Sequence, residues 1–255
     1  WGYLARNPME YVERPPQRPV RPAVVLDEVQ AVALLRAARA ERLGAVFALA
    51  LTTTMRIGEI LALRWEDLDL ERRRVRVTRT LSRLGGRWLE TEGKTAASRR
   101  TIDLAPWVVA WLRAHQARQA AERAQAATWV RPDLVFTSQY HPGAPVNSGV
   151  LRLYVLPRIL RRAGLDVRMC LHDLRKTAIS LYLRAGEDLK VVQRLAGHAT
   201  PAMTLHVYRN LVGDEAREAV DRFAPRLDPD GTPRGADREP PNNLPVRSRR
   251  GAQLA

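Results

Sequence analysis

Apolar residues recur at helical spacing along most of the chain, in segments that capping residues separate. In the first segment, LDEVQAVALLRAARA, Asp27 can cap a helix together with Gln30 three residues later. Val29, Val32 and Ala33 supply one apolar face, which we expect to pack on the core. The pattern therefore predicts an amphipathic helix that begins at Asp27.

The next two segments are predicted to form the centre of the core. LGAVFALALTTT (residues 43–54) is apolar almost throughout, and MRIGEILALRW follows it directly. Two charged residues, Arg56 and Glu59, interrupt the second segment. Its core-like residues are Ile57, Ile60, Leu61 and Leu63. Further helical segments are predicted at residues 106–127, 149–164, 171–186, 188–197, 200–208 and 214–223.

One region has the alternating pattern of β-strands. Residues 72–81 alternate charged and apolar side chains, and residues 87–91 follow a Gly-Gly turn. Residues 99–105 form a third short alternating run. We expect a small three-stranded antiparallel sheet at residues 73–104, within an α+β fold that is mainly helical.

The charge of the chain favours a polyanionic partner. Its 255 residues include 42 Lys and Arg against 27 Asp and Glu, a formal net charge of +15. The segment from Pro225 onward holds six Arg and four acidic residues, a net charge of only +2. Most of the excess therefore lies on the part that should fold, as expected for a nucleic-acid-binding surface.

Cysteine content and hydropathy indicate the compartment. Cys170 is the single cysteine, so neither an intrachain disulfide nor a cysteine-based metal cluster can form, and a reducing environment fits best. No apolar run is long enough to span a membrane, and no charged-then-apolar leader is seen. We expect a cytoplasmic protein that does not enter a membrane.

Several polar residues lie at the edges of otherwise apolar segments. His172 and Arg175 are three residues apart, so they face the same side of one predicted helix. Each residue of this kind has an ordinary explanation when taken alone, such as a solvated helix start or a helix cap. The full set is Arg56, Lys94, His172, Arg175, His198 and Tyr208.

The order and spacing of this set resemble a known family, the tyrosine recombinases or phage integrases. TTTMRIGEILALRW, KTAASRRTIDL, LHDLRKTAISLYLRAG and LAGHATPAMTLHVY resemble the family's successive boxes. The second arginine and the tyrosine are 208 − 175 = 33 residues apart, and the last histidine and the tyrosine 208 − 198 = 10. All six family positions are filled, and the resemblance covers about residues 1–224.

The resemblance implies that Tyr208 attacks a DNA phosphodiester and becomes covalently joined to the DNA. Arg56 and Arg175 would hold the non-bridging oxygens, because guanidinium groups offer fixed, paired donors that stay charged. His198 would donate a further hydrogen bond. A tyrosine hydroxyl has an ordinary pKa of about 10, so it needs nearby cations or a base to act as a nucleophile.

Proton transfer is expected to involve two further residues. His172 is the candidate base or proton relay, and Lys94 is the candidate acid for the departing 5′ oxygen. The segment with Lys94 also carries Arg99 and Arg100 as alternative cations. Glu59, one turn after Arg56, is a candidate carboxylate for orienting that arginine. No acidic cluster suited to Mg²⁺ and no phosphate-cradling glycine loop accompanies the boxes, so no metal and no cofactor are expected.

The resemblance also implies a domain organisation. Residues 1–25 resemble the end of the family's core-binding domain and the linker after it, and the chain begins with Trp1, so we expect a fragment or processed piece. Residues 26–224 are the expected catalytic domain. Residues 225–255 are rich in Pro, Gly, Asn and Arg and are expected to be disordered.

The expected function is site-specific cleavage and rejoining of double-stranded DNA, in integration or excision of a mobile element. Family members act as tetramers on two duplexes, so a homo-oligomer is expected, with accessory DNA-bending proteins as possible partners. Two alternatives remain at this point. One is a type IB topoisomerase, which uses the same chemistry, and the other is a truncated, catalytically idle DNA-binding fragment.

Overall fold

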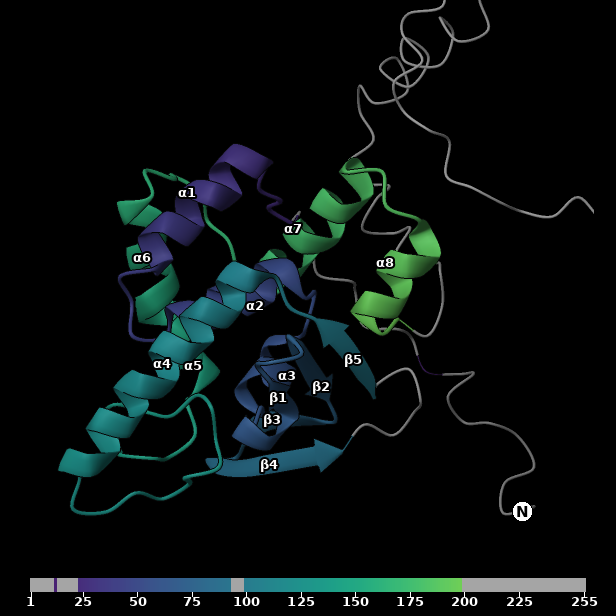
Figure 1. Cartoon of the computed structure of the whole chain (residues 1–255). Coiled ribbons are helices and arrows are strands. Elements are labelled where there is room, and N and C mark those ends of the chain that lie inside the picture. Colours follow the sequence, from purple (N-terminus) through teal and green to yellow (C-terminus); the bar gives the residue numbers. More distant parts are fainter. Residues whose placement is uncertain (1–11, 13–22, 93–98, 199–255) are drawn as a thin grey trace, which may run out of the picture. The chain divides into compact units, whose positions relative to one another are not determined.

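The computed structural model describes residue 12 and residues 23–92 and 99–198, all within one compact unit of the chain (Figure 1). The α-helices are α1 (Glu28–Ala38), α2 (Gly44–Thr52), α3 (Ile57–Leu61), α4 (Pro106–Gln125), α5 (Ser148–Val150), α6 (Leu156–Arg162), α7 (Leu171–Arg184) and α8 (Leu189–Ala196). The strands are β1 (Leu68–Asp69), β2 (Arg74–Val77), β3 (Arg79–Leu84), β4 (Arg87–Glu92) and β5 (Arg100–Asp103). A 3₁₀ turn, Trp65–Asp67, and a π-helical turn, Leu151–Val155, complete the regular structure of these residues.

The start of α1 is as the sequence predicts, but its buried face is not. Asp27 accepts a hydrogen bond from the Gln30 amide at 2.8 Å, and the Gln30 side chain accepts one from the Asp27 amide at 3.1 Å. Val29 and Val32 are exposed, however, and Ala33 is only half-buried, so the expected apolar face is wrong. The residues of α1 that are buried are Ala31, Leu34 and Ala38.

Helix α2 is the centre of the core. All its residues from Gly44 to Leu51 are buried, and it packs against α1, α3, α4 and α7 (Figure 1). Gly44 is required where the helix starts, because a Cβ there would lie 2.2 Å from the carbonyl oxygen of Ala38. The core residues expected in the next segment, Ile60, Leu61 and Leu63, are buried, and Ile57 is half-buried.

The β region differs from the expected sheet. The run at residues 72–81 is divided at Thr78 into β2 and β3, which belong to two different sheets. Strand β2 lies between β1 and β5 in an antiparallel three-stranded sheet, whereas β3 pairs with β4 in a separate antiparallel hairpin. The third expected strand therefore pairs with the first half of the run and not with β4. The chain bends at Thr78 and passes from one sheet to the other, which explains both pairings.

The helices after the sheet follow the predicted order. Helix α4 begins with Pro106, and Pro157 lies in the first turn of α6, directly after the π-helical turn. Helix α8 ends at Gly197, whose φ of 62° is in the left-handed region that favours glycine. The helices expected at residues 200–208 and 214–223 lie outside the described residues. Among the helices that the structure describes, none is both long and apolar enough to cross a bilayer.

Candidate active site

Arg56 and Glu59 are brought together by the start of α3. Arg56 is the N-cap residue, and the Glu59 carboxylate accepts a hydrogen bond from its backbone amide at 2.8 Å. The same carboxylate accepts a second bond from Arg56 Nη1 at 3.0 Å. Glu59 is buried, whereas the Arg56 side chain is 39% exposed. Glu59 thus fixes both ends of Arg56 while leaving part of its guanidinium open to solvent.

Arg100, the first residue of β5, also binds the Glu59 carboxylate. Its Nη2 lies 2.9 Å from Glu59 Oε2 and its Nη1 lies 3.3 Å from Glu59 Oε1. Its Nε donates to the backbone oxygen of Leu195 at 2.8 Å. Although burial acts to raise it, the pKa of Glu59 is lowered by Arg100 and, less strongly, by Arg56. Glu59 is therefore an ionised carboxylate between two arginines.

Arg175 is buried at the start of α7 and bonds to two backbone carbonyls. Its Nη1 donates to the oxygen of Thr54, and its Nη2 donates to the oxygen of Ala196 at 2.6 Å. Burial, together with the positive charge of Arg56, lowers the pKa of Arg175 to about 9. The side chain is therefore still charged at neutral pH, and an anion next to it would be stabilised.

The turn before Arg56 is held by α7 at two points. Tyr182 donates its hydroxyl to the oxygen of Thr52 at 2.6 Å, and Arg175 donates to Thr54. Thr54 has a φ of 55°, which is unusual for a β-branched residue. Its conformation directs the carbonyl toward Arg175. Burial raises the pKa of Tyr182, which makes its hydroxyl a poor nucleophile.

Two imidazoles lie next to these arginines. His172 on α7 is open to solvent on one side, and the protein that covers its other side, together with the charge of Lys176, lowers its pKa. His198 is buried just after α8, and burial and the charge of Arg175 lower its pKa to about 4. Both rings are therefore neutral near pH 7, so each carries one N–H donor and one acceptor nitrogen.

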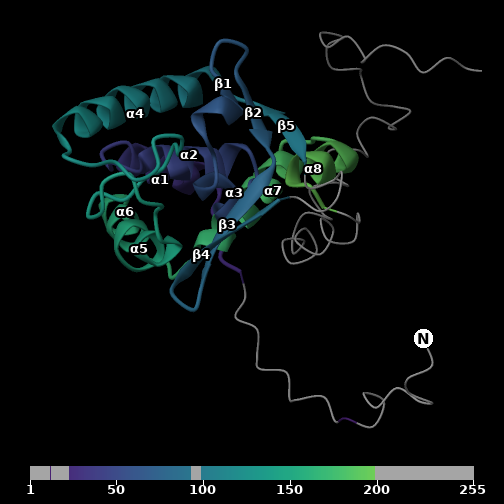
Figure 2. The same cartoon turned by 90° about the horizontal axis from the view of Figure 1, so that it is seen from below.

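The charges in this cluster do not balance. Arg56, Arg100 and Arg175 supply three positive charges and Glu59 one negative charge, an excess of 3 − 1 = 2. The formal charges of Lys176 and Asp173, which both act on His172, cancel each other. The elements that carry them meet where β5 lies beside α8, next to α3 and α7 (Figure 2). A partly buried site with excess positive charge and fixed N–H donors is suited to an anion such as a phosphate.

Comparison with known proteins identifies the family. The sequence model of the phage integrase family matches residues 24–213. The chain belongs to the phage integrase family. A tyrosine recombinase XerC-like protein of Caldanaerobacter subterraneus subsp. tengcongensis is 29% identical over 239 residues, which cover 86% of this chain and 60% of that protein. An integrase of Streptomyces ambofaciens is 30% identical over 220 residues, which cover 82% of this chain and 55% of that protein.

Solved integrase structures share the fold. The Tn1549 transposon integrase in complex with transposon right end DNA has a TM-score of 0.65 at 24% identity, covering 81% of this chain and 68% of that chain. The XerA recombinase has a TM-score of 0.63 at 24% identity, covering 82% and 67%. The predicted α+β, mainly helical fold class is confirmed. This integrase-family chain spans less than two thirds of the length of the two curated relatives.

The structure brings together five of the seven residues singled out from the sequence. Arg56, Glu59, His172, Arg175 and His198 belong to one cluster, in which the charge of Arg56 acts on both imidazoles and on Arg175. The other two, Lys94 and Tyr208, lie outside the described residues. Among the described residues, no three His, Cys, Asp or Glu side chains gather as ligands of a metal ion.

Arg100 has a larger part in the site than the sequence predicts. The sequence offers it only as an alternative cation to Lys94, whereas its guanidinium contacts Glu59 and Leu195. The strand period carries the missing signal, because Arg100 and Ile102 are two residues apart on β5 and Ile102 is buried. The neighbouring Arg99 lies on the other side of the chain, where its exposed side chain forms an ion pair with Glu92 at 3.2 Å.

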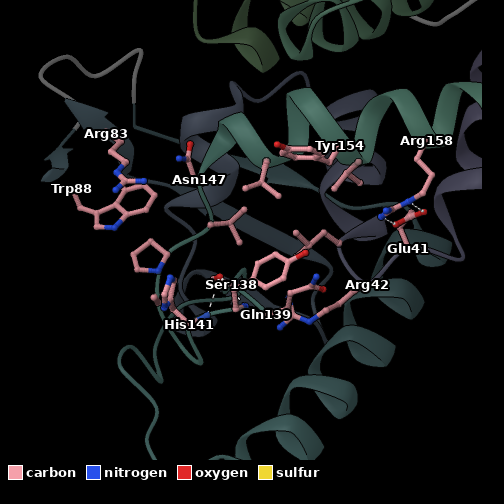
Figure 3. Close-up of a pocket in the computed structure, with 17 residues that line it drawn as sticks. Glu41, Arg42, Arg83, Trp88, Ser138, Gln139, His141, Asn147, Tyr154 and Arg158 are labelled. Carbon is pink, nitrogen blue, oxygen red and sulfur yellow. Dashed lines mark hydrogen bonds and ion pairs between the residues drawn. The ribbon is translucent and has the colours of Figure 1, made fainter. Parts of the chain in front are cut away.

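A large cavity elsewhere on the molecule contains none of these candidates. It has a volume of about 610 Å³ and lies between Trp88 at one end and the Glu41–Arg158 ion pair at the other (Figure 3). Tyr154 projects at its edge and is 65% exposed. This cavity has no residue in common with the arginine cluster. The cluster, which gathers Arg56, Arg175 and His198, is therefore the candidate active site.

Proposed function

We propose that this chain is a site-specific DNA recombinase that cleaves and rejoins strands through a covalent 3′-phosphotyrosine, in integration or excision of a mobile element. One observation carries the proposal: Arg56 and Arg175 lie in one cluster with two neutral imidazoles and an excess of two positive charges. Membership of the phage integrase family supports it. The Tn1549 integrase structure, which contains transposon DNA, supports double-stranded DNA as the partner.

In the proposed reaction, the two arginines bind the phosphate that is attacked. Arg56 presents the open part of its guanidinium, while Arg175 has further N–H donors beyond the two used by Thr54 and Ala196. Negative charge grows on the non-bridging oxygens as the bond to phosphorus forms, so these fixed donors stabilise the transition state more than the ground state. His198, with a neutral ring, donates one more hydrogen bond.

Two proton transfers complete the step. The oxygen of Tyr208 forms a bond to phosphorus while the bond to the 5′ oxygen breaks. His172 accepts the phenolic proton, which its neutral ring permits, and Lys94 gives a proton to the departing 5′ oxygen. The phosphotyrosine keeps a phosphodiester bond in place of the broken one, so attack by a 5′ hydroxyl reverses the reaction without ATP.

The proposed assembly follows from the reaction. Exchange between two duplexes requires four strand cleavages, so we propose a homotetramer on two duplexes, assisted where needed by proteins that bend DNA. Residues 26–224 are proposed as the catalytic domain, in a protein that acts in the cytoplasm.

Trapping of the covalent intermediate tests this function. The chain is incubated at low salt with a pool of nicked duplexes that are randomised around the nick, so that cleavage releases a short strand and cannot be reversed. We expect a denaturation-resistant protein–DNA adduct whose peptide contains Tyr208, while Tyr208→Phe binds DNA but gives no adduct. Sequencing of the attached DNA identifies the preferred site.

The alternatives give different results in the same assay. A catalytically idle fragment forms no adduct with any duplex in the pool. A topoisomerase forms adducts across the pool with little preference for sequence, whereas a recombinase selects particular sequences from it. An adduct at Tyr154 or Tyr182 in place of Tyr208 would show that the assigned nucleophile is wrong.

A further inference from the structure

We propose that Arg100 is a positioning residue for strand cleavage. It orients Arg56 through Glu59, and it holds the C-terminal end of α8, which leads to His198. This inference rests on the proposed function, because it assigns Arg100 to the same reaction. Arg100 is suited to the role by its place: its side chain is only 7% exposed and contacts α3 and α8 at once.

The first part of the inference comes from the way Glu59 is surrounded. Its Oε1 accepts from Arg56 Nη1 at 3.0 Å and from Arg100 Nη1 at 3.3 Å. Its Oε2 accepts from the Arg56 amide at 2.8 Å and from Arg100 Nη2 at 2.9 Å. A carboxylate accepts about four hydrogen bonds, so these four leave it with no alternative orientation. Half of that restraint comes from Arg100.

Loss of Arg100 would therefore change Arg56 without touching it. Glu59 would stay buried but would have two donors where it had four, and it could rotate about its last side-chain bond. The guanidinium of Arg56 is held in the described structure by Glu59 alone, through Nη1. A carboxylate that can rotate no longer fixes the direction of that guanidinium toward a phosphate.

The second part concerns the C-terminal end of α8. The last carbonyls of a helix have no partners within the helix, and cations there interact favourably with its dipole. Arg100 Nε binds the oxygen of Leu195 at 2.8 Å, and Arg175 Nη2 binds that of Ala196 at 2.6 Å. Gly197 then turns the chain in the left-handed region, and His198 follows. By holding the end of α8, Arg100 thus helps to fix the position of His198.

Only arginine can make this set of contacts. The two Nη atoms bind the carboxylate side by side, while Nε points to a carbonyl on another helix. A lysine ammonium is a single point charge on a flexible stem, so it can pair with Glu59 but cannot bind Leu195 in the same fixed geometry. The substitution Arg100→Lys therefore separates charge from geometry.

The experiment compares single-turnover adduct formation and DNA affinity for four proteins: the wild type, Arg100→Met, Arg100→Lys and the control Arg113→Met. Arg113 forms an Arg–Glu ion pair with Glu71 on the surface, so its loss changes the net charge equally. At saturating protein we expect the rate constant for Arg100→Met to fall about tenfold to a hundredfold, because small misplacements of reacting groups have effects of this size. DNA affinity should change by less than about twofold relative to Arg113→Met.

A pH profile distinguishes positioning from a general loss of structure. Arg100 is the main favourable partner of Glu59, which otherwise faces Arg56 and Arg175. In Arg100→Met we expect the pKa of Glu59 to rise. Over the pH range in which Glu59 of this variant becomes protonated, its cleavage rate should fall. The wild-type rate should stay constant over the same range. The double variant Glu59→Gln/Arg100→Met has no such group and should lose this added pH dependence.

The outcomes separate the two proposals. If the wild type forms no adduct, the proposed function fails, whatever Arg100 does. If the wild type is active and Arg100→Met has the same rate constant and pH profile, the positioning role is wrong. Arg100→Lys keeps the charge and gives an independent test when the Met variant is unstable: it should keep the wild-type pH profile with a reduced rate, and a full wild-type rate would overturn the inference.

Discussion

Arg175 Nη2 lies 2.6 Å from the backbone oxygen of Ala196, so a residue near the start of α7 is hydrogen-bonded to the last residue of α8. The bond joins the helix that carries His172 to the end of the helix that precedes His198. His172 and His198, which lie on different elements, are thereby linked through the buried side chain of Arg175. Substitution of Arg175 should therefore affect both phosphate binding and the position of His198.

For this reason we expect Arg175→Lys to be more damaging than Arg56→Lys. Each variant loses paired donors to the developing oxyanion, which typically lowers a rate about a hundredfold to a thousandfold. Arg175→Lys also loses at least one of two buried backbone contacts. Single-turnover adduct formation at saturating protein measures the effect on the chemical step, and a binding titration measures the effect on affinity. A near-normal rate for Arg175→Lys would exclude the proposed role in holding phosphate.

The pKa of His198 predicts a pH dependence of stability. Its value of about 4 is below the ordinary 6.5, so between these values the unfolded chain binds more protons than the folded one. This contribution to stability is present above about pH 6.5 and is lost as the pH falls toward 4. At about 1.4 kcal/mol per pKa unit, the difference between 6.5 and about 4 corresponds to at most about 3.5 kcal/mol.

The measurement compares wild type with His198→Gln by denaturant unfolding between pH 7 and pH 4. The glutamine variant lacks the titrating ring, so its stability should fall less over this range. Other groups titrate in both proteins and cancel in the difference. If the free energies of unfolding of the two proteins changed equally with pH, His198 would not be held in its neutral form by the fold.

The helical part of the fold could largely be predicted from sequence, because capping residues and Gly197 mark where helices start and end. The buried face of α1 could not. Its sequence EVQAVALLRAA has apolar residues on more than one side, so spacing alone does not decide between Val29 and Ala31. Packing against α2 and α6 decides it, and those contacts are not visible in a local pattern.

Long-range pairing limited the prediction of the site in the same way. The segments that resemble the family's motifs indicate that their arginines and histidines lie together in one site, because the family uses these residues in one reaction. Arg100 pairs with Glu59, 41 residues away, and with the oxygen of Leu195, 95 residues away. The pairing of β5 with β2 places it there, and a one-residue change of register would turn Arg100 to the opposite face.

Lys94 can be tested by changing the leaving group. A 5′-bridging sulfur departs without a proton, whereas a 5′ oxygen needs one. We therefore expect Lys94→Ala to cleave ordinary DNA slowly but to regain most of its rate on the sulfur-containing duplex. Arg99→Ala serves as the comparison, because Arg99 is an exposed cation that the sequence offers as an alternative to Lys94. Equal defects of Lys94→Ala on both duplexes would instead indicate that Lys94 contacts a phosphate.

The charge distribution predicts how DNA affinity responds to salt. The net charge of the chain is +15, and residues 225–255 contribute only +2, so 15 − 2 = 13 of the excess charges lie before Pro225. Each phosphate contacted adds about −0.9 to the slope of log K against log salt concentration, because counterions are released. Deletion of residues 225–255 should therefore change the slope by no more than about two contacts, or about 1.8. Fluorescence anisotropy from about 50 to 200 mM salt measures both slopes. If the deletion removed most of the slope, DNA would be bound mainly by the last 31 residues and not by the surface around the arginine cluster.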